Sequence, residues 1–215
     1  MKQVGVLGSG QVGEVLANAF LTLGYAVKRG SRSPEKLQAW ADKAGPKASV
    51  GTFAATAQFA DVVVLAVKGD AAEAVLEACE NNLSGKAVID TTNPIADAPP
   101  EQGVLRFFTD INDSLMERLQ RKFSSANFVK AFSTVGNPLM FRPDFGDTRP
   151  TQFICGNDSG AKATVTSILD EFGWDVEDMG GAIAARAIEP MCMLWCITGL
   201  KGGPWDRHAF KLLKR

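Results

Sequence analysis

The sequence contains few of the residues that build metal centres and disulfide frameworks. His208 is the only histidine among 215 residues, which argues against a multi-histidine metal centre or a Ser-His-Asp triad built on a spare histidine. The cysteines are scattered through a mid-sized chain, which is not the pattern of a disulfide scaffold: Cys79, Cys155, Cys192 and Cys196. We therefore expect free thiols in a reducing compartment.

Two of these cysteines lie four residues apart, at a spacing that shares one face of a helix. They are Cys192 and Cys196, and no second cysteine pair or histidine lies near them in the sequence. Buried free thiols are the expected state of such a pair, and a metal site is the alternative.

An excess of charge of one sign is also lacking. The chain has 23 Lys and Arg against 24 Asp and Glu, a net charge of −1, which argues against a general nucleic-acid surface or an acidic tail. Hydrophobic residues make up 46% and charged residues 22%, so wholesale disorder is excluded. Glycines interrupt the N-terminal run MKQVGVLGSG and no small-residue cleavage site follows. We expect no secretory signal and a cytoplasmic location.

Short apolar runs alternate with helical patterns along the chain. The clearest run is Asp61–Val67, which is apolar on both faces, as expected for a central parallel strand. Strands separated by helical crossovers predict an α/β fold with a parallel sheet and helices on both faces. The other predicted strands are Val4–Leu7, Tyr25–Arg29, Lys47–Val50, Ala87–Asp90, Phe128–Phe132 and Gln152–Cys155. The predicted helices are 12–23, 34–44, 53–59, 70–79, 115–123 and 161–172.

The stretch Gly181–Leu200 is very apolar and approaches the length of a membrane span. Arg186, Glu189 and Pro190 argue against spanning, because charges are costly in the centre of a bilayer. We expect a helix buried between domains or subunits.

One motif carries most of the functional signal. Gly8-Ser9-Gly10-Gln11-Val12-Gly13 is a GxGxxG that follows a predicted strand and opens a predicted helix. In dinucleotide-binding βαβ units the first Gly permits a tight turn, the second lets backbone approach a pyrophosphate, and the third lets helix and strand pack closely. N–H groups at the helix start then stabilise the phosphates. This context predicts a doubly wound Rossmann domain.

The end of the second strand distinguishes the two nicotinamide dinucleotides. NAD-binding proteins carry an Asp or Glu there for the ribose 2′-hydroxyl, whereas this chain reads KRGSRSPEK from Lys28 to Lys36. Ser31 can donate a hydrogen bond and Arg32 can bind phosphate oxygens in a fork. The segment therefore favours NADP(H) over NAD(H).

Several segments closely resemble the deazaflavin (coenzyme F420)-dependent NADP oxidoreductase family. They are GVLGSGQVG, GSRSPEK, DVVVLAV, VIDTTNPI, VKAFSTVG and MGGAIAARAIEPM, and the resemblance spans essentially the whole chain. The oxidoreductase domain of membrane ferric reductases is also similar, although those chains carry a transmembrane part. The resemblance implies a Rossmann domain with a smaller helix-rich C-terminal domain, and a homodimer.

The resemblance also implies functional positions. It implies contacts with NADP phosphates from Ser9 to Val12, and with the 2′-phosphate from Ser31, Arg32 and Lys36. We expect an NADP-binding domain over 1–135 and a substrate and dimerisation domain over 136–215. The carboxyl ends of the strands independently place eight residues at the rim of the ligand cleft. They are Val67, Lys68, Thr92, Asn93, Pro94, Thr134, Val135 and Gly136.

The predicted reaction moves hydride between NADPH and a deazaflavin or flavin-like acceptor. Orientation and exclusion of water supply most of the effect in such a transfer, so no residue is assigned a catalytic role. Asp90, Thr134 and His208 are the residues for which one can be argued, and Trp174, Trp195 and Trp205 are candidates for stacking on a tricyclic ring. A free flavin, a ferric chelate, or a small carbonyl or imine is the alternative acceptor. A non-catalytic NADPH-binding redox sensor is the alternative function.

Overall fold

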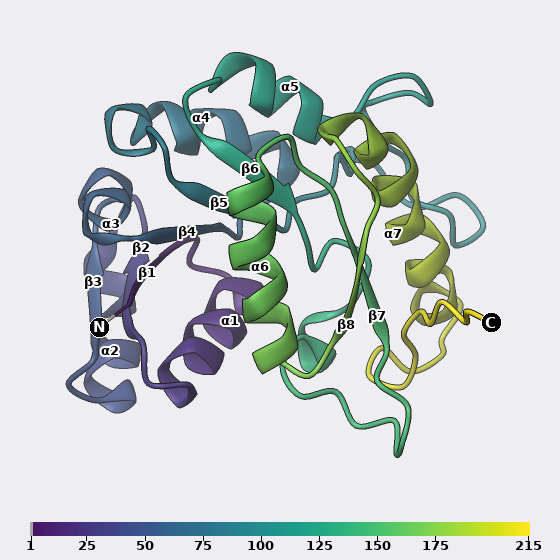
Figure 1. Cartoon of the computed structure of the whole chain (residues 1–215), viewed down its shortest axis with the longest axis horizontal. Helices are drawn as coiled ribbons and strands as arrows, with labels where there is room; N and C mark the ends of the chain where they lie inside the picture. Colours follow the sequence, from purple (N-terminus) through teal and green to yellow (C-terminus); the bar gives the residue numbers. More distant parts are fainter. Residues whose placement is uncertain (1) are drawn as a thin grey trace.

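The computed structural model describes residues 2–215, and its main feature is a sheet of six parallel strands (Figure 1). The strand order is β3-β2-β1-β4-β5-β6, which is the order of a Rossmann fold, with the chain reversing direction across the sheet between β1 and β4. This confirms the predicted fold class. The strands are β1 Gln3–Leu7, β2 Ala26–Gly30, β3 Ala48–Gly51, β4 Val62–Leu65, β5 Ala87–Asp90 and β6 Asn127–Lys130.

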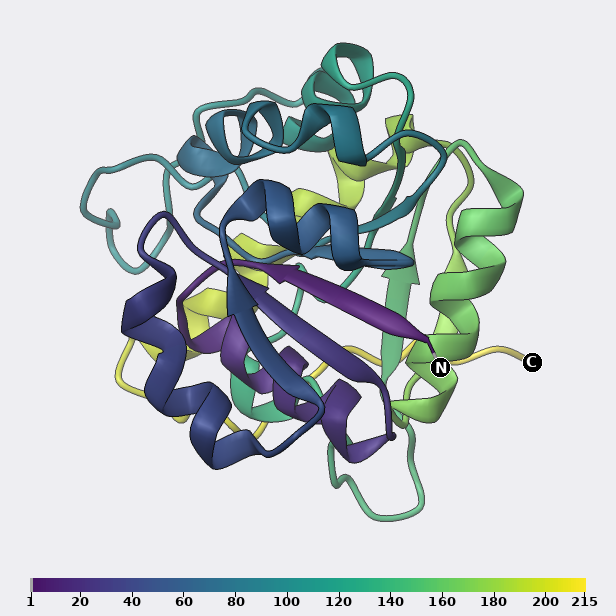
Figure 2. The same cartoon turned by 90° about the vertical axis from the view of Figure 1, so that its left-hand side faces the viewer.

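Helices cover both faces of this sheet, as Figure 2 shows from the β3 side. One face carries α1 and α6, whose side chains Leu16, Phe20 and Leu169 belong to the same apolar cluster as Val4 of the sheet. The other face carries α3, α4 and α5 in a second apolar cluster. The helices are α1 Gln11–Thr22, α2 Gln38–Ala44, α3 Phe53–Phe59, α4 Ala72–Glu77, α5 Leu115–Lys122, α6 Ser159–Glu171 and α7 Ala185–Leu200.

A second, two-stranded parallel sheet follows β6. It pairs β7 (Thr151–Ile154) with β8 (Asp175–Asp178), and an isolated antiparallel bridge from Lys130 to Cys155 ties it to the end of β6. The crossover helix between its strands, α6, packs on β5 and β6. Residues after 135 therefore share the core of the large sheet, and the predicted boundary between two domains near that point stays a prediction.

The predicted apolar helix forms as α7 and continues through Pro190. Ala182–Leu200 has a mean hydropathy of 1.3 over 19 residues, long and apolar enough to cross a membrane by those criteria alone. One side of α7 packs beside α5 and carries the buried Ile188, Glu189 and Trp195. The opposite side exposes Leu194, and Ile183 is exposed in the 3-10 turn Ala182–Ala184 that precedes α7; each is 61% accessible.

Several predicted elements differ in detail from the structure. The strand expected over Phe128–Phe132 ends at Lys130, because Phe132 takes a left-handed backbone conformation with φ of 60°. The helix expected from Pro34 starts with a 3-10 turn, Pro34–Leu37, before α2. Strand β8 was not predicted. Its residues Asp-Val-Glu-Asp contain no apolar run, and they are half-buried or exposed in the structure.

Candidate functional site

The three motif glycines each meet a different steric demand at the turn between β1 and α1. Gly8 has φ of +147°, and a Cβ there would lie 2.1 Å from the Ala66 carbonyl oxygen. A Cβ on Gly13 would lie 2.9 Å from the Gly8 carbonyl oxygen, so the helix can approach the turn only with glycine there. A Cβ on Gly10 would meet no atom within 4 Å. Gly10 therefore leaves open space above the backbone, as a pyrophosphate requires.

The start of α1 completes this turn. Gly10 is the N-cap residue, and Ser9, Gly10 and Gln11 are exposed. The first N–H groups of a helix lack intrahelical partners and carry the positive end of the helix dipole. Val12 is half-buried beside them. The predicted residues from Gly8 to Gly13 thus lie together, with backbone donors facing solvent at the carboxyl edge of the sheet.

A buried cation lies behind the glycine turn, and the sequence pattern did not identify it as part of the site. Arg29, on β2, is fully buried, and its guanidinium bonds to the Gly10 carbonyl oxygen at 3.3 Å and to Glu14 Oε2 at 3.2 Å. Its guanidinium carbon also lies 4.8 Å from the centre of the Trp40 ring. Burial lowers the pKa of Arg29, while Glu14 partly offsets this. Arg29 therefore connects the glycine turn to α1 and α2 and holds it in place.

The residues predicted to bind a 2′-phosphate follow directly after β2. Ser31 is buried, and its Oγ accepts a hydrogen bond from the Ser33 N–H at 3.1 Å. Arg32 and Lys36 are exposed, and neither forms an ion pair with any residue in the described range 2–215. Two unpaired cations flank one turn, and no carboxylate ends β2. This arrangement suits an anionic group beside the adenosine ribose.

The ends of β4, β5 and β6 supply the other half of this edge. Val67 is half-buried after β4, and Asn93 after β5 donates from Nδ2 to the Ser133 carbonyl oxygen at 2.8 Å. That bond joins the loops after β5 and β6. The Asn93 Oδ1 and Ser133 Oγ atoms are buried without a partner among the described residues. Thr134 is buried beside Ser133 in the loop after β6.

Asp90 belongs to a buried charge cluster beneath this edge. Lys130 Nζ lies 2.7 Å from Asp90 Oδ2, 2.9 Å from Glu189 Oε1 and 2.8 Å from the Thr92 carbonyl oxygen. Glu189 also accepts the N–H groups of Leu115 and Met116 at the start of α5. Burial acts to lower the pKa of Lys130, but its two carboxylate neighbours outweigh burial and raise it. The cluster joins β5, β6, α5 and α7.

The aromatic candidates divide between the core and the C-terminal segment. Trp174 is 1% accessible and donates to the Met140 carbonyl oxygen, so it is a core residue. Trp195 stacks on His208 with ring centres 4.7 Å apart, and packs against Gly136 and Trp205. His208 Nε2 lies 2.9 Å from the Trp195 carbonyl oxygen. The Trp195 group therefore reaches Gly136 at the start of the loop after β6.

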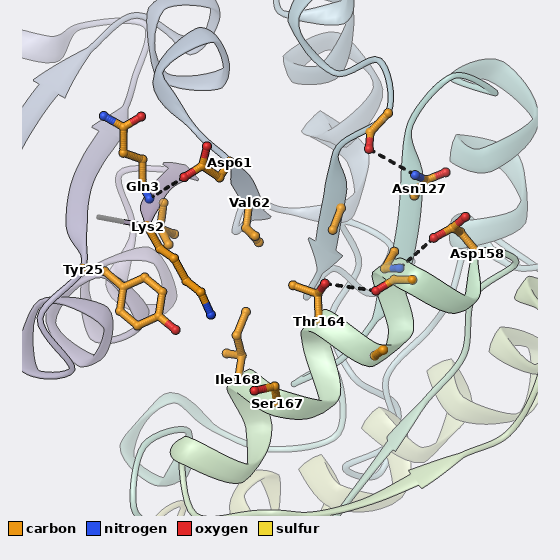
Figure 3. A pocket seen from close by; sticks show the side chains of 16 residues that line it. Lys2, Gln3, Tyr25, Asp61, Val62, Asn127, Asp158, Thr164, Ser167 and Ile168 are labelled. Carbon is orange, nitrogen blue, oxygen red and sulfur yellow. Dashed lines mark hydrogen bonds between the residues drawn. The ribbon is translucent and has the colours of Figure 1, made fainter.

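A large cavity lies at the opposite edge of the sheet. It measures about 850 Å³ and lies between α6 and the starts of β1, β4, β5 and β6 (Figure 3). Lys2, Tyr25 and Asp61 line one side, and Thr164 and Ser167 of α6 line the other. Ligands in doubly wound sheets bind at the carboxyl ends of strands. This cavity is therefore separate from the candidate dinucleotide site.

Comparison with known proteins gives the family context of this site. The family model described as NADP oxidoreductase, coenzyme F420-dependent, matches residues 3–94, which contain the glycine turn and the segment after β2. A protein of known structure from Arthrobacter sp. FB24, named as an F420-dependent NADP-reductase, is 32% identical and superposes with a TM-score of 0.89 over 100% of both chains.

Two further proteins are less similar to this chain. The metalloreductase STEAP3 of Rattus norvegicus is 29% identical over 190 residues, which is 87% of this chain and 36% of that protein. The chain thus spans about a third of that curated relative. An imine reductase from Myxococcus stipitatus in complex with NADP+ has a TM-score of 0.66 at 16% identity, over 94% of this chain and 63% of that one. The latter likeness shows the fold alone.

Proposed function

Because the chain belongs to the coenzyme F420-dependent NADP oxidoreductase family and is an NADP-dependent oxidoreductase, we propose that it moves hydride between NADPH and a deazaflavin or flavin-like acceptor. The observation that carries this proposal is the pairing of the Gly8–Gly13 turn with the unpaired cations Arg32 and Lys36 after β2. The name of the Arthrobacter protein supports coenzyme F420 as the acceptor.

The residues at the carboxyl edge fit NADP(H). The backbone of Ser9, Gly10, Gln11 and Val12 would hold the pyrophosphate, since Gly10 leaves open space beside exposed N–H donors. Ser31, Arg32 and Lys36 would hold the 2′-phosphate. Because Val67 and Asn93 follow β4 and β5, we place the nicotinamide half near these two residues.

Hydride transfer from NADPH requires little acid–base chemistry from the side chains of the protein. NADPH supplies the hydride when bound, and the protein contributes orientation, closeness and exclusion of water. The Asn93–Ser133 bond fixes the two loops that would flank the nicotinamide. Gly136, held against Trp195, continues the second of these loops. Rigid loops at this position would favour one orientation of the acceptor relative to the nicotinamide.

The test is oxidation of NADPH, followed by loss of its near-ultraviolet absorbance, with and without oxidised coenzyme F420. Rapid loss that requires both NADPH and coenzyme F420, with little loss when NADH replaces NADPH, is expected. Tight NADPH binding without coenzyme F420-dependent turnover would contradict the assignment of the acceptor.

A ferric chelate is the second candidate acceptor. The similarity to the rat metalloreductase over 87% of this chain favours it. In the same assay, NADPH oxidation with a ferric chelate but not with coenzyme F420 would establish this alternative.

We also propose that the protein is a cytoplasmic homodimer. The four cysteines are free thiols, as expected in a reducing compartment. Leu194 and the half-buried Met191 on the exposed side of α7, together with Ile183 just before the helix, form an apolar surface that suits a second copy of the chain. Light scattering coupled to size exclusion measures the mass in solution, and a monomer would contradict the dimer.

A further inference from the structure

Two thiols lie together on the inner side of α7, away from the exposed apolar side. The Sγ atoms of Cys192 and Cys196 are 3.9 Å apart on consecutive turns. Cys192 is buried and Cys196 is half-buried. Cys192 follows Glu189 by one turn, and Glu189 is the residue that binds Lys130 below the carboxyl edge of the sheet. The pair therefore adjoins the buried charge cluster and retains access through Cys196.

The separation of the sulfurs distinguishes a bridging cation from a disulfide. A disulfide needs sulfurs about 2.05 Å apart and Cβ atoms about 3.5–4.5 Å apart, whereas one helical turn holds Cβ atoms about 5–6 Å apart. Two bonds of about 2.3 Å to a tetrahedral cation place their sulfurs about 3.8 Å apart. The observed 3.9 Å matches the second geometry without any change in α7.

We propose that Cys192 and Cys196 form a binding site for a thiophilic d10 cation, such as Cu(I), Zn(II) or Cd(II). Thiolates select these soft ions over hard ones. Residues 2–215 as described contain no group of three or more His, Cys, Asp or Glu side chains placed to hold one metal ion. The remaining coordination positions therefore fall to solvent or a small ligand that enters beside Cys196. Because Trp195 lies between the two cysteines and its ring packs on Gly136, the bound ion would stiffen α7 against the loop after β6.

Cd(II) is the probe for this site, because its bonds to thiolates absorb in the ultraviolet. The reduced, chelator-treated full chain is titrated with Cd(II), and one equivalent is expected to produce a thiolate-to-metal band. Cys192→Ser and Cys196→Ser are each expected to weaken binding roughly 100-fold, since each removes one of two protein ligands. Cys79→Ser is the matched control, because Cys79 is a buried thiol whose hydrogen bond goes to the Val75 carbonyl oxygen.

A second measurement uses the wild-type chain alone, so it does not depend on the serine variants folding. Native alkylation followed by peptide mass mapping is expected to show Cys196 labelled without Cd(II) and protected by one equivalent. Unchanged labelling of Cys196 in the presence of Cd(II) would overturn the proposal. So would binding that persists in both folded serine variants, or that disappears in Cys79→Ser.

Discussion

The buried cluster around Lys130 gives a sharp prediction about stability. Lys130→Met removes the partner of two fully buried carboxylates, Asp90 and Glu189, and of the Thr92 carbonyl oxygen. Leaving a buried charge without its partner costs about 3–5 kcal/mol of unfolding free energy. For a chain of this size that loss lowers the melting temperature by roughly 6–20 °C. Glu189→Gln leaves Lys130 paired with Asp90, so its expected loss is smaller, about 1.5–3 kcal/mol.

The same variant has a diagnostic dependence on pH. In Lys130→Met the two buried carboxylates lose their cation, so taking up a proton relieves part of the cost of burying their charge. The folded variant then binds more protons than the unfolded one, and its stability increases as pH falls. Urea denaturation at pH 8 and pH 5 is expected to show the gap to wild type shrinking at the lower pH.

Lys122→Met is the matched control for this substitution. Lys122 pairs with Glu73 and Glu77 at the surface, where solvent screens the interaction, so its loss is expected to change stability little. A Lys130→Met variant as stable as Lys122→Met, with no change in the gap between pH 8 and pH 5, would refute the reasoning from the buried cluster.

Three further predictions test separate parts of the account. Gly8→Ala is expected to destabilise the fold, because its Cβ would lie 2.1 Å from the Ala66 carbonyl oxygen. Gly10→Ala is expected to keep the wild-type melting temperature but to bind NADPH more weakly, because a Cβ there enters the open space beside the turn. Equal losses of melting temperature and of NADPH affinity in the two variants would contradict this prediction. Burial would raise the pKa of Glu117, but hydrogen bonds from Arg186 and Ser114 outweigh burial and lower the pKa. The contribution of ionised Glu117 to the unfolding free energy is therefore lost as pH falls below about 4. Glu117→Gln is expected to reduce the dependence of the unfolding free energy on pH in this acidic range. If wild type and Glu117→Gln lost the same unfolding free energy between pH 7 and pH 3.5 in urea denaturation, this prediction would be contradicted. Leu194→Arg is expected to convert the dimer to a monomer in light scattering, and an unchanged mass would show that this side of α7 is not the interface.

Local patterns account for what the sequence predicted well. The GxGxxG segment was recognisable because Gly8, Gly10 and Gly13 lie at fixed spacings within one short segment between a predicted strand and a predicted helix. The strand that forms as β4 was predicted because successive residues of Asp61–Val67 are apolar, as expected for a strand covered on both faces. The parallel sheet with helices on both faces followed from the alternation of such runs with helical periodicity.

Contacts between distant residues account for what the sequence did not show. Asp90, Lys130 and Glu189 come from β5, β6 and α7, and no local spacing links them. Arg29 reads as part of an exposed basic segment, yet it is buried under the glycine turn by contacts with Glu14 and Trp40. The left-handed Phe132 that ends β6 is fixed by its buried surroundings, where its N–H donates to Gln152 Oε1.

The most direct test of the central claim compares the binding of NADPH and NADH by calorimetry in wild type and Arg32→Ala. Each charge-assisted bond to the 2′-phosphate is worth about 1.5–3 kcal/mol, so Arg32→Ala is expected to weaken NADPH roughly ten- to hundred-fold and to leave NADH unchanged. Arg121→Ala is the matched control, because Arg121 is an exposed arginine of α5 paired with Asp113. Equal weakening of both dinucleotides, or none, would contradict the assignment of NADP(H) to this edge of the sheet.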